Sequence, residues 1–409
     1  MAQIIESILV VGFNARPIVT YLCELGYKVY AIDFFGDVDL RQSCIEQAFA
    51  VLNQRPNKPL KRQLYRRPAE YLVILAEILA DEEGFDGIVI GSGLDDRPDL
   101  WERLEKLAPI LGNPSRELSA LRDRERLYKV AAQQGIPTPS YTKIRSVEEA
   151  LEEFKTQSPL ILKNPKTGGG MQMFYCSREE DVEPAAEELL TEQKEIFAYP
   201  FIEGQDASVS VLGGRTTSQV IGFTNQIIGE QRVYAPTRFA YCGNLIPSNI
   251  PKHITEELAM KFAKLTTQLH LKGLNGFDFI YNEKSEQAIL LELNPRILGS
   301  LEPQCRALSK NLMQFHIEAL VRMELPPLEW GYEKACIKLI LFAPQDNFIN
   351  PSLDVHEATD RSLPGVILQK GQPFCTVIQE APTSVEAQAK GLKKVEEIFK
   401  KENTLNTEF

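Results

Sequence analysis

The chain has 409 residues, of which 44% are hydrophobic, and its formal net charge at neutral pH is -11. At that length it exceeds one typical hydrophobic core, so roughly two to four packed units are expected. The negative charge would repel nucleic-acid phosphates and anionic lipid surfaces, and no basic stripe interrupts it. The composition therefore predicts a folded globular protein with no nucleic acid and no membrane among its partners.

The cysteines and histidines give no sign of a metal centre. Seven cysteines and four histidines are scattered along the chain without a CxxC pair, and an odd cysteine count argues against a disulfide framework. We expect reduced thiols and no zinc site. No apolar run approaches the roughly 20 residues of a membrane helix. These features predict a soluble, cytoplasmic protein, and a homo-oligomer is compatible with them.

A strand, helix and strand pattern opens the chain. Apolar strands are expected at residues 7–11, 28–32 and 87–90. Residues 1–112 are therefore predicted to form a Rossmann-like open sheet. Gly12 followed by Asp33 would suit the ribose of a dinucleotide, but the G-x-G-x-x-G pattern is absent, so no NAD or FAD site is expected.

A lysine and a glycine-rich loop follow in the next segment. Two S-x-x-E capping boxes, at Ser146 and Ser177, predict the starts of short amphipathic helices. Between them, a predicted strand at residues 160–163 ends on Lys163 and runs toward three glycines. Glycines without Cβ let backbone N–H groups wrap a polyphosphate. A triple glycine alone favours an ordinary hairpin turn over a phosphate-binding loop.

The most informative segment is a predicted β-hairpin with strands at residues 276–280 and 288–294. Asp278 lies on the first strand, and a strand period of two puts Glu292 and Asn294 on one face of the second. Mg²⁺ takes about six oxygen ligands, so two or three side-chain oxygens and several phosphate oxygens would complete its octahedron. Taken alone, two acidic strand positions favour solvent-facing residues of an ordinary hairpin.

The full string from Asp278 to the Glu-Leu-Asn-Pro-Arg run at residues 292–296 resembles the ATP-grasp superfamily. The resemblance implies that Asp278, Glu292 and Asn294 are ligands of the magnesium ions of MgATP. It also implies that Arg296 contacts the transferring phosphate or an intermediate, and that Leu290 belongs to the nucleotide site.

The same resemblance implies the phosphate-binding residues. Lys163 would contact the α- and β-phosphates, and a flap would form from Gly168, Gly169 and Gly170. Family members carry a second cation in the helix before the Gly-Ile-Pro-Thr-Pro segment. Arg124 is the candidate, with Lys129 as the alternative in a shifted register.

The resemblance also implies a hinge strand that reads the adenine, with Asp206 as the ribose ligand. The adenine contacts would come from Tyr199, Phe201 and Ile202. Pro200 departs from the family pattern, because relatives usually carry glutamate there and proline cannot donate a ladder hydrogen bond. The carbonyl groups of Tyr199 and Phe201 are therefore expected to contact the adenine.

The resemblance is to predicted ATP-dependent carboligases related to biotin carboxylase, and it implies an α/β and α+β multidomain fold. Residues 1–112 would form a Rossmann-like pre-ATP-grasp domain, and residues 113–198 the ATP-grasp small lobe with the flap. Residues 199–328 would form the large lobe with the metal hairpin, and residues 329–409 a small α+β C-terminal lobe.

The implied function is an ADP-forming ligase that joins a carboxylate to an amine through an acylphosphate, with ATP and Mg²⁺ or Mn²⁺ as cofactors. Arg296 and Lys163 would be its catalytic residues. Gly299 and Ser300 would offer backbone donors to the substrates, and Arg232 and Arg238 would suit anionic ones, although a solvated loop is equally compatible with those arginines. Two alternatives stay open: an enzyme that activates bicarbonate, of carboxylase or carbamoyl-phosphate type, and a non-catalytic nucleotide-binding sensor.

Overall fold

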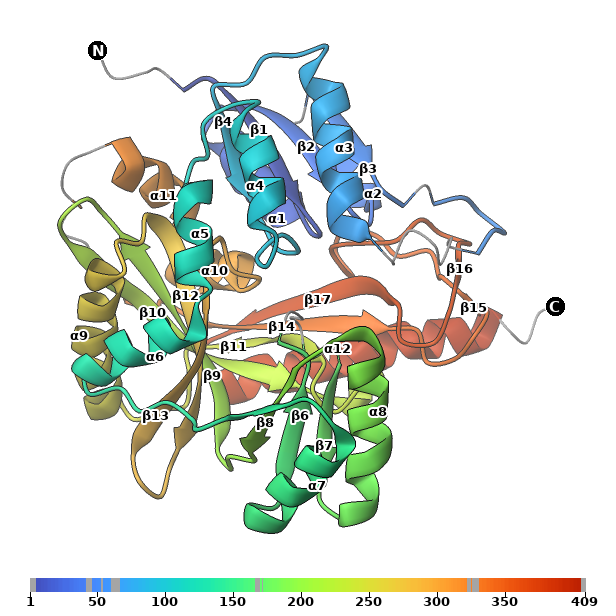
Figure 1. Cartoon of the computed structure of the whole chain (residues 1–409). Helices are drawn as coiled ribbons and strands as arrows, with labels where there is room; N and C mark the ends of the chain where they lie inside the picture. Colours follow the sequence, from blue (N-terminus) through green and yellow to red (C-terminus); the bar gives the residue numbers. More distant parts are fainter. Residues whose placement is uncertain are drawn as a thin grey trace.

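The computed structural model describes residues 5–41, 46–52, 54–59, 67–165, 170, 172–321, 325 and 331–405. Within that part of the chain, the strands form three larger sheets and one two-stranded sheet. Figure 1 shows the N-terminal sheet (blue) and the smaller antiparallel sheet (green) on either side of a long central sheet. None of the helices in the described ranges is both long and apolar enough to cross a membrane.

The N-terminal unit is a parallel sheet in the order β3-β2-β1-β4, covered by helices. Its strands are β1 (Ser7–Gly12), β2 (Lys28–Asp33), β3 (Gln47–Ala50) and β4 (Gly87–Ile90). Its helices are α1 (Arg16–Glu24), α2 (Val38–Arg41), α3 (Pro68–Ala80) and α4 (Pro98–Glu105). Because both faces are covered, residues 8–11 of β1 are all fully buried, as their unbroken apolar run predicts. The predicted Rossmann-like sheet is confirmed.

Asp33 ends β2, and its side chain holds both the loop before α1 and the turn after β2. Its carboxylate accepts hydrogen bonds from the backbone N–H groups of Ala15 at 2.8 Å and Gly36 at 2.6 Å. The side chain is fully buried. Asp33 therefore links the start of α1 to the turn after β2.

The small lobe is an antiparallel sheet in the order β5-β8-β6-β7, with two helices packed on one face. Its elements are β5 (Thr142–Ile144), α7 (Val147–Thr156), β6 (Leu160–Lys163), β7 (Met173–Cys176), α8 (Val182–Glu192) and β8 (Ile196–Pro200). Ser146 caps α7 as predicted, since its hydroxyl accepts from the Glu149 N–H at 3.2 Å. The predicted cap at Ser177 is replaced, because the Asp181 carboxylate accepts from the N–H groups of Ser177 and Arg178.

The large sheet has seven antiparallel strands in the order β13-β12-β9-β10-β11-β14-β17. Its strands are β9 (Gln205–Gly213), β10 (Ser218–Ile228), β11 (Tyr241–Ile246), β12 (Gly273–Asn282), β13 (Gln287–Asn294), β14 (Ala335–Phe342) and β17 (Pro373–Ala381). The C-terminal segment has the predicted mixture of strands and helix. Its strands β14 and β17 continue the large sheet through β11, so the sheet runs without interruption into the C-terminal segment.

The remaining helices pack around the large sheet. They are α5 (Ser115–Leu121), α6 (Arg124–Gln133), α9 (Lys252–Gln268), α10 (Leu301–Leu308), α11 (Leu312–Val321) and α12 (Ser384–Leu405), and a small sheet pairs β15 (Phe348–Ile349) with β16 (Ile367–Leu368). Leu127 and Ala131 of α6 belong to the hydrophobic core beneath the β12–β13 hairpin, together with Phe262 of α9. Helix α6 therefore packs against the hairpin that carries the predicted metal ligands.

Candidate active site

A cavity of about 1280 Å³ lies where the N-terminal unit, the small lobe and the large sheet meet. Its walls come from the loops after β1, β2 and β4, from β6 and β8 of the small lobe, and from β10 to β14 of the large sheet. The strand that ends on Lys163, the hinge strand and the metal hairpin therefore contribute to one cavity.

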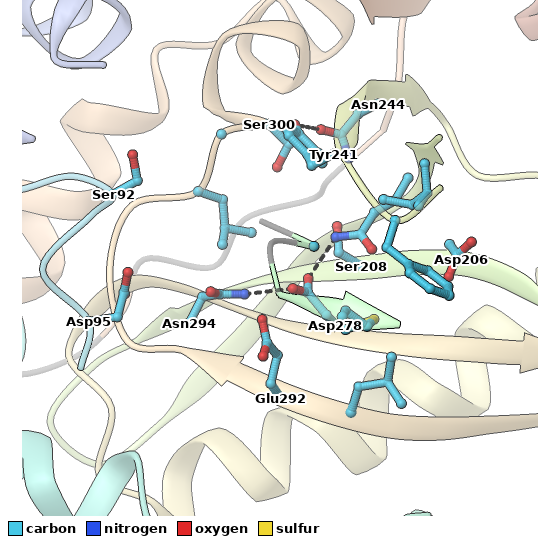
Figure 2. A pocket seen from close by; sticks show the side chains of 18 of the residues that line it. Ser92, Asp95, Asp206, Ser208, Tyr241, Asn244, Asp278, Glu292, Asn294 and Ser300 are labelled. Atoms are coloured by element: carbon cyan, nitrogen blue, oxygen red, sulfur yellow. Dashed lines mark hydrogen bonds between the residues drawn. The ribbon is translucent and has the colours of Figure 1, made fainter. Parts of the chain in front are cut away.

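The β12–β13 hairpin brings the three predicted metal ligands together in this cavity. Asp278 lies directly opposite Glu292 in the strand register. The Asp278 carboxylate accepts a hydrogen bond from the Asn294 side-chain amide and another from the Gln226 side-chain amide, each at 2.9 Å. Figure 2 shows Asp278, Glu292 and Asn294 side by side along the hairpin. The two carboxylates face the same space, and the Asn294 amide turns its nitrogen toward Asp278 and its oxygen toward Arg296.

A β-bulge separates this site from the adjacent apolar positions. The register pairs Asp278 with Glu292 but Phe279 with Leu290, which leaves Leu291 as the extra residue. Leu290 is fully buried in the core on the other side of the sheet, and Leu291 lines the cavity. The prediction that Leu290 belongs to the nucleotide site is therefore wrong, because the bulge turns the neighbouring leucine toward the cavity.

The two facing carboxylates have different protonation behaviour. Burial, reinforced by the negative charge of Glu292, raises the pKa of Asp278 to about 7. Burial also acts on Glu292, but the positive charges of Lys163 and Arg122 outweigh it and lower the pKa of that carboxyl. At neutral pH the pair therefore carries between one and two negative charges.

Lys163 lies at the end of β6, where the strand pattern places it. Its ammonium nitrogen is 3.5 Å from a Glu292 carboxylate oxygen, and the side chain lines the cavity. The lysine thus spans the gap between the small lobe and the metal hairpin. A phosphate chain between the two would contact both.

Arg296 is held in place by the N-terminal unit. Its Nε donates to the Asp95 carboxylate at 2.8 Å, and one terminal nitrogen donates to the Ile297 carbonyl at 2.9 Å. The other terminal nitrogen is 3.4 Å from the Asn294 side-chain oxygen. The guanidinium group therefore sits beside the metal-ligand group in a fixed orientation.

Arg124 is the candidate second cation, rather than Lys129. Arg124 lines the cavity, and its guanidinium carbon is 4.5 Å from the centroid of the Phe197 ring, while Lys129 is exposed and does not line the cavity. Sequence reasoning missed Arg122, which also lines the cavity. Arg122 donates to the Leu293 carbonyl at 2.7 Å and pairs with Asp96 at 2.8 Å.

The residues of the predicted hinge, at the end of β8 and the start of β9, also line the cavity. Tyr199, Phe201, Ile202 and Asp206 all face the cavity. The Phe201 N–H already donates to the Pro159 carbonyl at 2.9 Å, which leaves its carbonyl for a ligand. Burial raises the pKa of Asp206.

The described part of the predicted flap is Gly170, since Gly168 and Gly169 lie outside the described residues. Gly170 has a positive φ of 74° and lines the cavity. A Cβ there would be 1.7 Å from the Phe239 carbonyl oxygen. Glycine therefore allows close contact between the flap and the segment before β11.

The predicted substrate-side residues are only partly brought together. Gly299, Ser300 and Arg238 line the cavity. The guanidinium carbon of Arg238 is 3.9 Å from the centroid of the Tyr175 ring. Arg232 does not line the cavity. Its guanidinium group pairs with Glu230 at 2.7 Å, outside the cavity, because the short helix after β10 turns it away.

The donor set fits magnesium with a nucleotide better than a metal held by protein alone. No group of three or more His, Cys, Asp or Glu among the described residues could hold a metal ion. The hairpin offers two carboxylates and one amide, so phosphate oxygens would have to supply the rest of an octahedron. That division of ligands is typical of magnesium in enzymes that transfer phosphate.

Residues 121–300 match the family model of the ATP-grasp domain. The chain contains an ATP-grasp domain. The matched range covers Arg124, Lys163, Asp206 and the whole metal hairpin, and the predicted resemblance is confirmed.

The chain is similar to several known proteins. An uncharacterized protein of Methanocaldococcus jannaschii is 28% identical over 90% of this chain and 87% of its own length. A D-alanine–D-alanine ligase of Carboxydothermus hydrogenoformans is 26% identical over a matched region that covers 46% of this chain and 62% of that ligase. One similar solved structure is the biotin carboxylase domain of a Hydrogenobacter thermophilus 2-oxoglutarate carboxylase, in complex with MgADP and bicarbonate. It superposes on this chain with a TM-score of 0.73 at 18% identity, and the match covers 96% of this chain and 90% of that one. The last similarity shows the fold.

Proposed function

We propose that this ATP-grasp protein is an ADP-forming ligase that joins a carboxylate to an amine through an acylphosphate. The observation that carries the proposal is the meeting of Asp278 and Glu292 with Lys163 and Arg296 around one cavity. The sequence similarity to a D-alanine–D-alanine ligase supports the same class of reaction.

The nucleotide would lie between the small lobe and the hairpin. The carbonyl groups of Tyr199 and Phe201 would accept from the adenine, and Asp206 would accept from the ribose hydroxyls. Lys163 and Arg124 would bind the phosphates. Asp278, Glu292 and Asn294 would hold Mg²⁺, which when bound neutralises negative charge on the phosphates.

The first chemical step gives the acid a good leaving group. A carboxylate oxygen of the substrate attacks the γ-phosphorus of ATP, and the bond from that phosphorus to the ADP oxygen breaks. Arg296 is oriented by Asp95 toward this position and would hold the phosphoryl oxygens. Lys163 would neutralise charge that builds on the ADP side.

The second step forms the amide. The amine nitrogen attacks the acyl carbon, inorganic phosphate leaves with the electrons of the carbon–oxygen bond, and the nitrogen gives up a proton. Arg296 would stabilise the oxyanion formed on the way. Contact of Gly170 with the segment before β11 would exclude water, which otherwise hydrolyses the acylphosphate.

Both alternatives have less support. The cavity extends to aromatic side chains such as Phe13 and Phe374. A bicarbonate ion is too small and too polar to fill the apolar space beside these rings. A sensor that does not hydrolyse ATP would not need Arg296 to be fixed by Asp95 beside the metal-ligand group.

The proposal is tested by ADP formation. The protein is incubated with MgATP and pools of carboxylic acids and amines, and ADP is measured alongside a mass spectrum of the products. We expect ADP only when both an acid and an amine are present, with a product whose mass is their sum less water. No ADP above background with any pool, or ADP with bicarbonate alone, would overturn the proposal.

The matched variants are two changes in the same hairpin. Glu292→Gln removes the proposed metal ligand, and we expect ADP formation to fall by about 100-fold or more. Glu286→Gln makes the same chemical change in the exposed turn between β12 and β13, and we expect full activity. Equal activity of the two variants would remove Glu292 from the site.

A further inference from the structure

The end of the cavity that faces the N-terminal unit is lined with aromatic rings. They are Phe13, Phe35, Phe342 and Phe374. Phe13 is stacked on Phe34 with ring centroids 4.9 Å apart, and Phe34 packs edge-on against Phe35 at 5.1 Å. This end of the cavity, which we call the aromatic chamber, is therefore a fixed apolar wall and not a phosphate site.

Two buried carboxyl groups line the same chamber. Asp37 is 3% exposed and Asp360 is 8% exposed, and both line the cavity. They come from opposite ends of the chain, and two hydrogen bonds between their neighbouring segments bring them together. The Val38 N–H donates to the Arg361 carbonyl at 2.8 Å, and the Asp360 N–H donates to the Asp39 carboxylate at 2.8 Å.

One oxygen of Asp360 accepts no hydrogen bond of ordinary geometry, although the nearby Thr376 side chain helps to lower the pKa of the carboxyl. Its Oδ1 accepts from the Arg16 guanidinium at 2.5 Å, while its buried Oδ2 accepts no hydrogen bond from any described residue. The Ser300 hydroxyl, which also lines the cavity, is likewise buried with no partner among the described residues. Buried polar atoms of folded proteins are nearly always satisfied, so both atoms indicate a missing ligand.

The cluster around the chamber is short of positive charge. The acidic groups are Asp33, Asp37, Asp39, Glu302 and Asp360, and the basic groups are Arg16, Arg306, Lys338 and Arg361. The excess of negative charge acts most strongly on the carboxyl group of Asp37. Burial, together with the negative charges of Asp33 and Asp360, raises the pKa of Asp37 well above its usual range.

Asp360 keeps its charge. Burial acts to raise its pKa, but the positive charges of Arg16 and Lys338 outweigh burial and lower the pKa of Asp360 to about 2. Lys338 itself donates to the Gly299 carbonyl at 3.0 Å. The chamber thus presents one fixed carboxylate with a free oxygen and one carboxyl group that a cation would ionise.

We propose that the aromatic chamber is the amine subsite, and that it takes a primary ammonium ion with a flat apolar arm. The ammonium group lies between Asp37 and Asp360 and donates to the free Asp360 oxygen. The apolar arm lies against the phenylalanine rings. This inference rests on the proposed ligase function and adds the class of its second substrate.

An organic cation fits better than a metal ion. The rings supply no ligand atoms for a metal, whereas they bury an apolar arm and attract an adjacent positive charge. Among the described residues, no group of three or more His, Cys, Asp or Glu could hold a metal here. An anionic substrate would meet two buried carboxyl groups, which disfavours it.

The test is equilibrium binding to the full chain without nucleotide, by isothermal titration calorimetry at neutral pH. The probes are phenethylamine, ethylamine, which lacks the ring, and hydrocinnamate, which replaces the ammonium with a carboxylate. We expect phenethylamine to bind at least about tenfold more tightly than ethylamine, and hydrocinnamate to show no binding. Tighter binding of hydrocinnamate, or no binding of phenethylamine, would overturn the inference.

Two variants locate the subsite. Asp37→Asn should weaken phenethylamine binding by about tenfold or more, while Asp81→Asn, the same change at an exposed position, should not. Should Asp37→Asn fail to give a cooperative thermal transition, Phe35→Leu replaces it and should reduce the preference for phenethylamine over ethylamine. Unchanged phenethylamine affinity in Asp37→Asn, or an unchanged preference in Phe35→Leu if that variant is used instead, contradicts the inference.

The outcomes separate this inference from the proposed function. Phenethylamine binding without ADP formation from any pool would leave the cation subsite standing and remove the ligase. ADP formation with anionic or small polar amines, without phenethylamine binding, would keep the ligase and remove the aromatic subsite.

Discussion

At the scale of single residues, the pairing of Asp278 with Glu292 decides the chemistry. Burial, together with the negative charge of Glu292 directly opposite, raises the pKa of Asp278 to about 7. A folded protein retains such an arrangement at a cost in stability. The cost is understandable if a divalent cation normally lies between the two side chains.

This arrangement predicts a stability effect that depends on pH. The folded-state pKa of Asp278 lies above the value of about 4 for an unfolded aspartate. Its contribution to stability is therefore full below about pH 4 and is lost as the pH rises through 7. Asp278→Asn should raise the free energy of unfolding of the ligand-free protein by about 2 kcal/mol at pH 8, with little gain at pH 4.

The measurement is urea unfolding at both pH values, without magnesium or nucleotide. The same variant should lose magnesium-dependent nucleotide binding. A variant less stable than the wild type at both pH values would show that the hydrogen bonds from Asn294 and Gln226 outweigh the repulsion.

At the scale of elements, local sequence predicted the strands better than it predicted their pairing. The strand at residues 160–163 and both strands of the metal hairpin lie where the pattern placed them, because period-two alternation and turn residues are local signals. The bulge that exposes Leu291 and buries Leu290 is a property of two strands together. No pattern within one strand could reveal it.

Helix caps show the same limit. Ser146 caps α7 by accepting from the Glu149 N–H, and the Glu149 carboxylate accepts from the Arg145 N–H at the same turn. At Ser177 the carboxylate of Asp181, one residue beyond the predicted Glu180, takes the backbone N–H groups instead. Where two candidates lie one residue apart, spacing alone does not choose between them.

The flap gives a prediction at this scale. In Gly170→Ala the new Cβ would collide with the Phe239 carbonyl oxygen, and the positive φ would strain any side chain. We expect the KM for ATP to rise by about tenfold or more in steady-state kinetics of ADP formation.

Gly84→Ala is the control, because nothing lies within 4 Å of a Cβ at Gly84. We expect the Gly84 variant to keep the wild-type KM. Equal KM values in the two variants would mean that the contact between Gly170 and Phe239 has no part in nucleotide binding.

At the scale of the whole molecule, contacts between distant parts of the chain assemble the site. Asp95 of the N-terminal unit orients Arg296, and Gln226 of β10 holds Asp278. Arg122, next to the predicted Arg124, reaches the carbonyl of Leu293. Sequence reasoning could not assign these partners, because each pair joins segments that no local pattern connects.

The largest of these contacts is the ion cluster around Arg16. Its guanidinium group pairs with Asp360 at 2.5 Å and Asp39 at 3.3 Å, and it also pairs with Glu302. All four side chains are buried or nearly so. The cluster joins α1 of the N-terminal unit to α10 and to the C-terminal segment.

Removing the arginine should therefore destabilise the whole molecule. Arg16→Met leaves buried carboxylates without their cation, and we expect a loss of about 3–5 kcal/mol in the free energy of unfolding by urea. Arg145→Met removes an exposed pair with Glu195 and should cost less than about 1 kcal/mol. Equal losses would show that the cluster does not hold the units together.

The most direct test of the central claim is the position of a divalent cation in a crystal grown with Mn²⁺ and a non-hydrolysable ATP analogue. Anomalous scattering from Mn²⁺ locates the ion independently of the protein model. We predict a peak within ligand distance of the Asp278 and Glu292 carboxylates, about 2.0–2.3 Å, with the triphosphate on its other side and next to Lys163. A triphosphate bound elsewhere, or a manganese peak that neither carboxylate touches, would contradict the account.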